Sequence, residues 1–203
     1  MARIVRLDEN NLAAEMASAA EVLAADGLAI FPTETFYGIA ADHANPAALA
    51  KLVALKGRDE DKPLALILSA AEEADRLAVG ITPAARKLMA RFWPGPLTLI
   101  LQARPGLDPC LVSADGGVGM RVSPHQAANG LAQALGRAIT ATSANLAGRP
   151  AVARVTELDP LVAAGADVIL DMGDCPGGMA STVADARYEP PLVLRAGAVD
   201  VFS

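Results

Sequence analysis

The stretch GLAIFPTETFYGIA, residues 27–40, passes from an apolar run directly into a polar cluster. Residues 28–31 have the pattern of a buried strand that ends at Pro32. The cluster that follows, residues 32–38, holds two threonines, a glutamate and a tyrosine, which packing alone does not require. One interpretation is a turn whose threonine hydroxyls bind local backbone. The other is a polar rim at the C-terminal end of a strand, where open α/β sheets commonly bind ligands.

The same alternation of short apolar runs with Ala- and Leu-rich stretches continues along the chain, and it predicts an α/β layer fold. Helices are predicted over residues 11–25, 45–56 and 82–92; an Asn-Pro and a Thr-Pro pair open the last two. Strands are predicted at residues 4–7, 28–31, 64–68, 97–101, 118–122, 138–142, 168–170, 182–184 and 192–194. The pair Asp159-Pro160 has the character of a modest turn, and no linker divides the chain, so a single domain over residues 1–203 is predicted.

Composition narrows the class of function. The chain has 203 residues, of which 53% are hydrophobic and only 3% aromatic, so its core must be built from Ala, Leu, Val and Ile. The formal net charge of −6 and the scarcity of aromatic residues argue against nonspecific binding of nucleic acid. They do not exclude a local basic patch. The N-terminus is charged and no run reaches membrane-spanning length, so we expect a cytoplasmic protein without membrane contact.

Several familiar catalytic and metal motifs are absent from the sequence. Cys110, Cys175, His43 and His125 are isolated from one another, so no structural zinc site is predicted, and Cys175 is interpreted as an ordinary loop residue. The sequence has no phosphate-binding P-loop, no GxGxxG after a strand and no GxSxG nucleophile elbow.

Cationic side chains recur beside the predicted strands. Lys56 and Arg58 flank a glycine at a predicted helix end, where they either offset the helix dipole or bind a polyphosphate or carboxylate. Arg121 lies inside an apolar strand, where it requires either a structural ion pair or an anionic ligand. Arg195 ends the predicted strand 192–194.

Two further clusters of small polar side chains end strands in the same way, at residues 140–145 and at Ser181-Thr182. Each by itself is also explained as a cap or a turn. Three hydroxyl clusters together with three cationic sites favour a pocket for a small anionic substrate.

Taken in order, these segments resemble the YrdC-like threonylcarbamoyl-adenylate synthases. The matching segments are PTETFYG (32–38), KGRDEDKPL (56–64), FWPGPLTLIL (92–101), MRV with His125 (120–125), TSANLAG (142–148), STV (181–183) and LRAG (194–197). The resemblance implies a twisted mixed β-sheet with surrounding helices and a large open cavity. It also implies an enzyme that forms threonylcarbamoyl-AMP and pyrophosphate from L-threonine, bicarbonate or CO₂, and ATP. The product would serve the threonylcarbamoylation of tRNA adenosine 37, with tRNA or a separate transferase complex as a transient partner.

The resemblance further assigns roles to individual residues. Lys56 and Arg58 would be the catalytic pair. The ATP-binding residues would be Lys56, Arg58, Thr142, Ser143, Asn145 and Arg195. The threonine-binding residues would be Thr33, Arg121 and Ser181, with Thr35 and Tyr37 shaping the pocket. Mg²⁺ would arrive with ATP rather than on a protein metal site, and no tightly bound organic cofactor is expected.

Two features depart from the family pattern. Ser123 stands where the family usually has proline, which affects the local loop more than Arg121. The chain also ends soon after LRAG, so we expect it to lack the additional C-terminal domain of longer members.

Two alternative functions share the fold. The first is an RNA-binding or ribosome-maturation module, against which the charge and the few aromatics count. The second is a carbamoyl-adenylate-handling relative of the hydrogenase maturation proteins, which carry zinc-finger-like cysteines that this sequence lacks.

Overall fold

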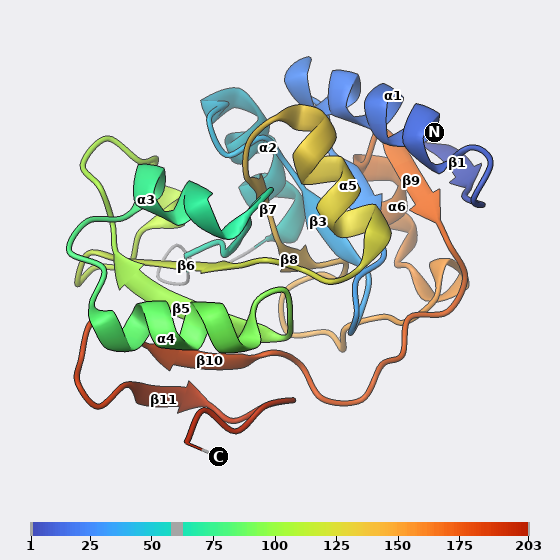
Figure 1. Ribbon diagram of the computed structural model, residues 1–203. Coiled ribbons are helices and arrows are strands. Elements are labelled where there is room, and N and C mark those ends of the chain that lie inside the picture. The colour runs from blue at the N-terminus through green and yellow to red at the C-terminus, as the bar shows by residue number, and fades with distance from the viewer. Residues whose placement is uncertain (1, 58–62, 203) are drawn as a thin grey trace.

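A computed structural model describes residues 2–57 and 63–202 and shows two mixed β-sheets covered by helices (Figure 1). In chain order the elements are β1 (Arg3–Arg6), α1 (Leu12–Ala24), β2 (Ala29–Phe31), β3 (Gly38–Ala40), α2 (Pro46–Lys56), β4 (Leu66–Ile67), η1 (Ala71–Glu73), α3 (Ala74–Leu77), α4 (Pro83–Phe92), β5 (Leu97–Gln102), η2 (Pro109–Leu111), β6 (Gly117–Arg121), α5 (Gln126–Leu135), β7 (Ile139–Thr140), β8 (Thr142–Ser143), η3 (Val155–Glu157), α6 (Pro160–Gly165), β9 (Val168–Asp171), β10 (Thr182–Asp185) and β11 (Leu192–Arg195). The predicted mixed α/β fold is confirmed, with the sheet divided in two.

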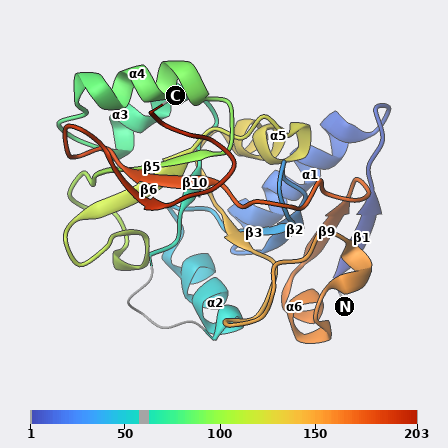
Figure 2. The same ribbon diagram turned by 90° about the horizontal axis from the view of Figure 1, so that it is seen from below.

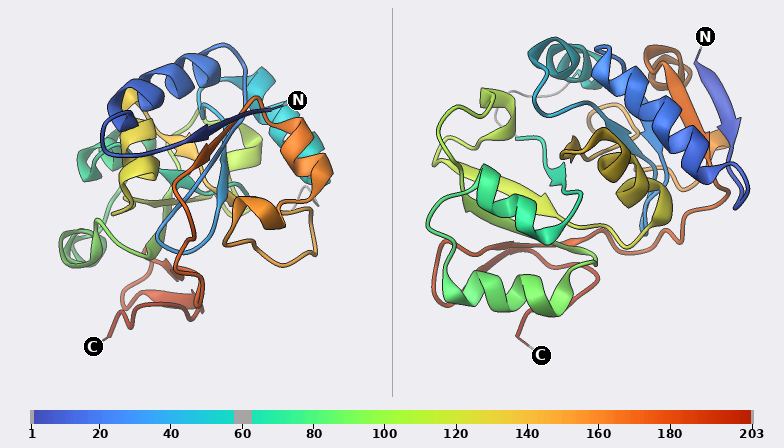
Figure 3. Two further views of the ribbon diagram at one scale, coloured as in Figure 1. Left: turned by 90° about the vertical axis from the view of Figure 1, so that its right-hand side faces the viewer. Right: turned by 45° about the horizontal axis from the view of Figure 1, so that its top comes forward.

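The first sheet has the strand order β1-β9-β2-β3-β8 and is covered on both faces. β1, β9 and β2 run parallel, whereas β3 runs antiparallel to both of its neighbours. Alternate residues of β2 point to opposite faces. Phe31 packs in the cluster formed with α1 and α5, which lie side by side in the right-hand view of Figure 3. Ile30 packs in the other cluster, with residues of α2 and α6.

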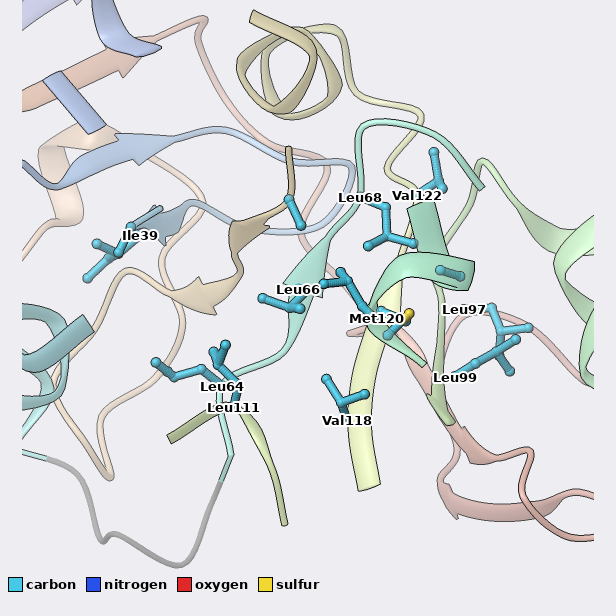
Figure 4. Packing of buried hydrophobic residues seen from close by; sticks show 14 of the residues in the cluster. Ile39, Leu64, Leu66, Leu68, Leu97, Leu99, Leu111, Val118, Met120 and Val122 are labelled. Atoms are coloured by element: carbon cyan, nitrogen blue, oxygen red, sulfur yellow. The ribbon is translucent and has the colours of Figure 1, made fainter. Parts of the chain in front are cut away.

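The second sheet has the order β11-β10-β5-β6-β4-β7 and presents two unlike faces. Leu66, Met120 and Leu99 are paired across β4, β6 and β5, and they stack with Leu97 and Val118 on the apolar face (Figure 4). The same buried cluster includes residues of α3 and α4. The opposite face carries polar and small residues, and it is the face that lines the cavity described below. Figure 2 shows β5, β6 and β10 beside the first sheet from below.

Residues 139–143 pass directly from the second sheet to the first. The sequence predicts a single strand over 138–142, but the structure divides it at Ala141, so that β7 pairs with β4 and β8 pairs with β3. The Ala141 amide donates to the carbonyl of Ala65, 2.7 Å away, where the chain leaves one sheet for the other. This crossing holds the open edge of the first sheet against the second.

Local helix signals are confirmed where the sequence supplies caps. The Asn45 side chain accepts from the amides of Ala47 and Ala48, and Thr82 accepts from Ala85. Gly57 ends α2 with a φ of 55°, the left-handed conformation that glycine adopts without strain.

The interpretation of Asp159-Pro160 as a simple turn is wrong. Asp159 caps α6 through a bond from the Leu161 amide, with Pro160 as the first helical residue. The helix α5 and the strand β3 are present although no element was predicted there.

Within residues 2–57 and 63–202, no helix combines the length and the hydrophobicity that a membrane crossing requires.

Candidate active site

The polar cluster that follows β2 forms a tight turn closed by Thr33. Its hydroxyl donates to the Phe36 carbonyl at 2.7 Å and accepts from the amides of Thr35 and Phe36 at 3.1 and 3.2 Å. Both lone pairs and the proton of this hydroxyl are therefore used within the turn. The turn interpretation of the sequence is confirmed. Thr33 and Thr35 also line the cavity, and the two hydroxyls lie 3.2 Å apart.

Lys56 lies at the end of α2 and turns its ammonium toward the segment after β8. The ammonium donates to the Ser143 carbonyl at 2.6 Å, to the Asn145 carbonyl and, at 3.3 Å, to the Asn145 side-chain oxygen. In return, the Ala147 amide donates to the Lys56 carbonyl at 3.1 Å. The side chain is nearly buried and also lines the cavity, so Lys56 shapes this wall as well as charging it. Arg58, the predicted second member of the pair, lies outside the described residues.

Asn145 uses its amide group to organise the loop in which it stands. Its nitrogen donates to the Leu146 carbonyl at 3.0 Å and to the Arg149 carbonyl, while its oxygen receives the Lys56 ammonium. Thr142 and Ser143 of β8 are half-buried beside it and line the same cavity.

Ser181, just before β10, and Arg195, at the end of β11, form a second polar wall. Arg195 donates from Nε and Nη2 to the Ser181 carbonyl at 3.1 and 2.8 Å, and from Nη2 to its hydroxyl at 3.1 Å. The Thr98 hydroxyl of β5 lies 3.1 Å from that of Ser181. Partial burial lowers the pKa of Arg195. Its hydrogen bonds to the Ser181 oxygens bring no negative charge to oppose this effect.

Arg121 ends β6 and forms an ion pair with Glu34 of the polar turn. Of the two explanations that the sequence left open, the structural ion pair is present. The guanidinium is almost wholly buried, and burial lowers its pKa, with the positive charge of Arg195 acting in the same direction. Glu34 opposes both effects.

The predicted site residues meet in one open cavity of about 730 Å³ between the two sheets. Those that line it are Thr33, Lys56, Arg121, Thr142, Ser143, Asn145, Ser181 and Arg195. No carboxylate occurs among its described lining residues, and elsewhere in the described chain no three His, Cys, Asp or Glu side chains gather as a metal site. The described lining therefore presents cations and hydrogen-bond donors, which suit an anionic ligand.

Sequence reasoning missed the floor of the cavity. Thr98 and Ile100 of β5 and Gly117 and Gly119 of β6 line it, although none was singled out as a site residue. The signal was the alternation in LTLILQ, which places Thr98 and Ile100 on the face opposite the buried leucines. A side chain at Gly117 would be crowded, because a Cβ there would lie 2.6 Å from the Ile100 methyl, whereas a Cβ on Gly119 would make only ordinary contact with Thr98.

Fold and cavity together define a class of protein: a mixed α/β protein with an open cavity whose cations and hydroxyls suit small anions. The chain belongs to the Sua5/YciO/YrdC family, whose model, described as telomere recombination, matches residues 21–197. The resemblance predicted from the sequence motifs is confirmed.

Similar proteins are named as synthases. The chain is 34% identical over 194 residues to the putative threonylcarbamoyl-AMP synthase of Mycobacterium leprae, covering 96% of this chain and 88% of the relative. It is 35% identical over 190 residues to the threonylcarbamoyl-AMP synthase of Bacillus subtilis, covering 91% of this chain and 54% of the relative. A crystal structure of Pyrococcus abyssi Sua5 complexed with L-threonine matches with a TM-score of 0.87 and 32% identity, covering 97% of this chain. The chain thus spans little more than half the length of the last two proteins, 54% and 57%.

Proposed function

We propose that this chain is an L-threonylcarbamoyladenylate synthase, which converts L-threonine, bicarbonate and ATP into threonylcarbamoyl-AMP, pyrophosphate and water. The observation that carries the proposal is that Lys56, Arg121 and Arg195 line one cavity together with hydroxyl side chains. None of the lining residues that the structure describes is an aspartate or a glutamate. The names of the relatives and the L-threonine in the Pyrococcus abyssi structure support it.

The chemistry has two steps. The neutral amine of threonine attacks the carbon of bicarbonate, or of CO₂ formed from it, and a C–O bond of bicarbonate breaks with departure of hydroxide. The nitrogen loses a proton as the carbamate forms, and this proton and the hydroxide give water. A carbamate oxygen then attacks the α-phosphorus of ATP, and the bond to the pyrophosphate oxygen breaks. Both steps concentrate negative charge among the reacting groups. Fixed cations in a low-dielectric cavity stabilise such transition states, and no covalent nucleophile from the chain is required.

The residues that line the cavity are assigned to the two substrates, and the wall formed by Ser181 and Arg195 serves both. We assign Lys56, Thr142, Ser143, Asn145 and Arg195 to ATP, and Arg58 with them. Because the Thr33 hydroxyl is used within its own turn, it shapes the threonine pocket, and Thr35 beside it supplies a hydroxyl to the substrate. Arg121 and Ser181 complete this pocket, with Arg121 facing the threonine carboxylate.

Magnesium is assigned to the nucleotide. The cavity offers no described carboxylate to hold the ion, so Mg²⁺ would be bound by the phosphates of ATP and would neutralise the departing pyrophosphate. We further propose that the reaction takes place in the cytoplasm and that its product passes to a transferase that modifies adenosine 37 of tRNA.

Release of pyrophosphate from ATP tests the proposal, measured with and without L-threonine and bicarbonate. Release that requires both substrates, with threonylcarbamoyl-AMP identified by mass spectrometry, is the expected result. A folded protein that releases no pyrophosphate but binds tRNA or ribosomal RNA would contradict it and favour the RNA-binding alternative.

A further inference from the structure

Arg121 lines the cavity, but the residue that binds its guanidinium does not. Its Nη1 donates to Oε1 of Glu34, and Glu34 is its hydrogen-bond partner within the part of the chain that the structure describes. Arg121 is among the residues that line the cavity, whereas Glu34 and Ser123 are not. The carboxylate therefore lies behind the guanidinium, and the other N–H groups of Arg121 remain available to a ligand in the cavity.

Glu34 is in turn held by Ser123. The Ser123 hydroxyl donates to Oε2 of Glu34 and accepts from the His125 amide at 3.1 Å, and the residue is fully buried. Both carboxylate oxygens thus have a partner on the segment that continues from β6. A proline at position 123, which the family resemblance led us to expect, has no hydroxyl and could not make this bond.

The charges explain why the guanidinium needs such support. Arg121 is nearly buried and is repelled by the second guanidinium on Arg195. A buried cation without a counter-ion is strongly unfavourable, and its side chain would turn toward solvent. A carboxylate behind it compensates the charge without occupying the cavity.

We propose that Glu34 is a positioning residue for the synthase reaction, with Ser123 as its support. Glu34 neutralises and orients Arg121 from behind, so that the free edge of the guanidinium meets the carboxylate of L-threonine. The substrate carboxylate adds to Glu34 and does not replace it, because both Glu34 oxygens are already held outside the cavity. This inference rests on the proposed function.

The test compares the binding of L-threonine with that of L-threoninamide, which lacks the carboxylate charge. Isothermal titration calorimetry on the full chain measures both affinities, and the affinity for ATP, in the wild type, Glu34→Gln and Ser123→Ala. We expect Glu34→Gln to reduce the preference for threonine over threoninamide by roughly tenfold, because disrupting a buried charge pair is costly. We expect Ser123→Ala to reduce it by about threefold, with the ATP affinity unchanged in both variants.

A matched control removes the same charge elsewhere. Glu21→Gln changes an exposed glutamate of α1 and is expected to leave the threonine-to-threoninamide ratio at its wild-type value. Circular dichroism confirms folding of each variant, and Ser123→Ala keeps the test decisive if Glu34→Gln does not fold.

Three results would overturn the inference. An unchanged ratio in both site variants would make the Glu34 network purely structural. Tighter threonine binding by Glu34→Gln would show that Glu34 competes with the substrate. A wild type that binds no threonine and releases no pyrophosphate would remove the proposed function together with this inference, whereas the first two results leave that function intact.

Discussion

Replacing Thr33 by valine should destabilise the protein more than replacing it by serine, although valine keeps the shape of the side chain. Valine removes a hydroxyl that donates to the Phe36 carbonyl at 2.7 Å and accepts from the amides of Thr35 and Phe36 at 3.1 and 3.2 Å. Thr33 is only 4% exposed, so water cannot fully replace these bonds. Each of these bonds contributes about 1 kcal/mol, and water can partly replace them at the half-buried Thr35 and Phe36. The free energy of unfolding should therefore fall by about 2 kcal/mol.

Serine keeps the hydroxyl and loses one buried methyl group, which costs about 0.8 kcal/mol. The valine variant should therefore unfold at a lower denaturant concentration than the serine variant. For a chain of this size the melting temperature of Thr33→Val should fall by roughly 4–8 °C.

Urea denaturation of the wild type and both variants measures these differences. The same preparations should show that Thr33→Ser binds L-threonine as the wild type does, because serine keeps the hydroxyl that closes the turn. A valine variant as stable as the serine variant would refute the reasoning about the turn. A folded serine variant that no longer binds threonine would show that the Thr33 methyl group contacts the substrate.

Three further predictions concern other residues. Lys56→Met should slow pyrophosphate release by roughly 100-fold and also lower the free energy of unfolding, because the ammonium both charges the cavity and holds the carbonyls of the neighbouring loop; a fully active variant would contradict this. The Nδ1 atom of His125 caps α5, and burial lowers the pKa of this histidine. The unfolded chain therefore binds the proton more readily than the folded chain does. As a result, the free energy of unfolding should fall as the pH drops below about 6.5. Urea titrations of His125→Asn, which keeps a capping group, should show a smaller fall between about pH 6.5 and pH 5.5; an equal fall would assign it to other groups. Burial raises the pKa of Cys175 to about 11, so iodoacetamide should label it near pH 8 only after unfolding, as mass spectrometry of the labelled peptides would show; rapid labelling of the folded chain would contradict this.

Much of the fold was predictable because the signals are local. Asn45 and Thr82 cap helices at the residues where the sequence places a cap, and Gly57 ends α2 in the left-handed conformation. Helix caps and the apolar faces of helices and strands depend on residues only a few positions apart, so the sequence alone is enough to identify them. The helix α5 was missed because its cap is His125, whose ring nitrogen substitutes for the usual Ser, Thr, Asp or Asn oxygen.

The candidate site divides in the same way. The sequence by itself indicated which polar side chains share a cavity, since hydroxyls and cations recur at the ends of its predicted strands, and the described ones line one cavity. Whether Arg121 meets a protein carboxylate or a ligand was decided only by the tertiary structure. Its partner Glu34 is 87 positions away, on the turn after β2 of the first sheet, whereas Arg121 ends β6 of the second sheet. Such a pairing depends on which strand ends meet in space, and no local pattern encodes that.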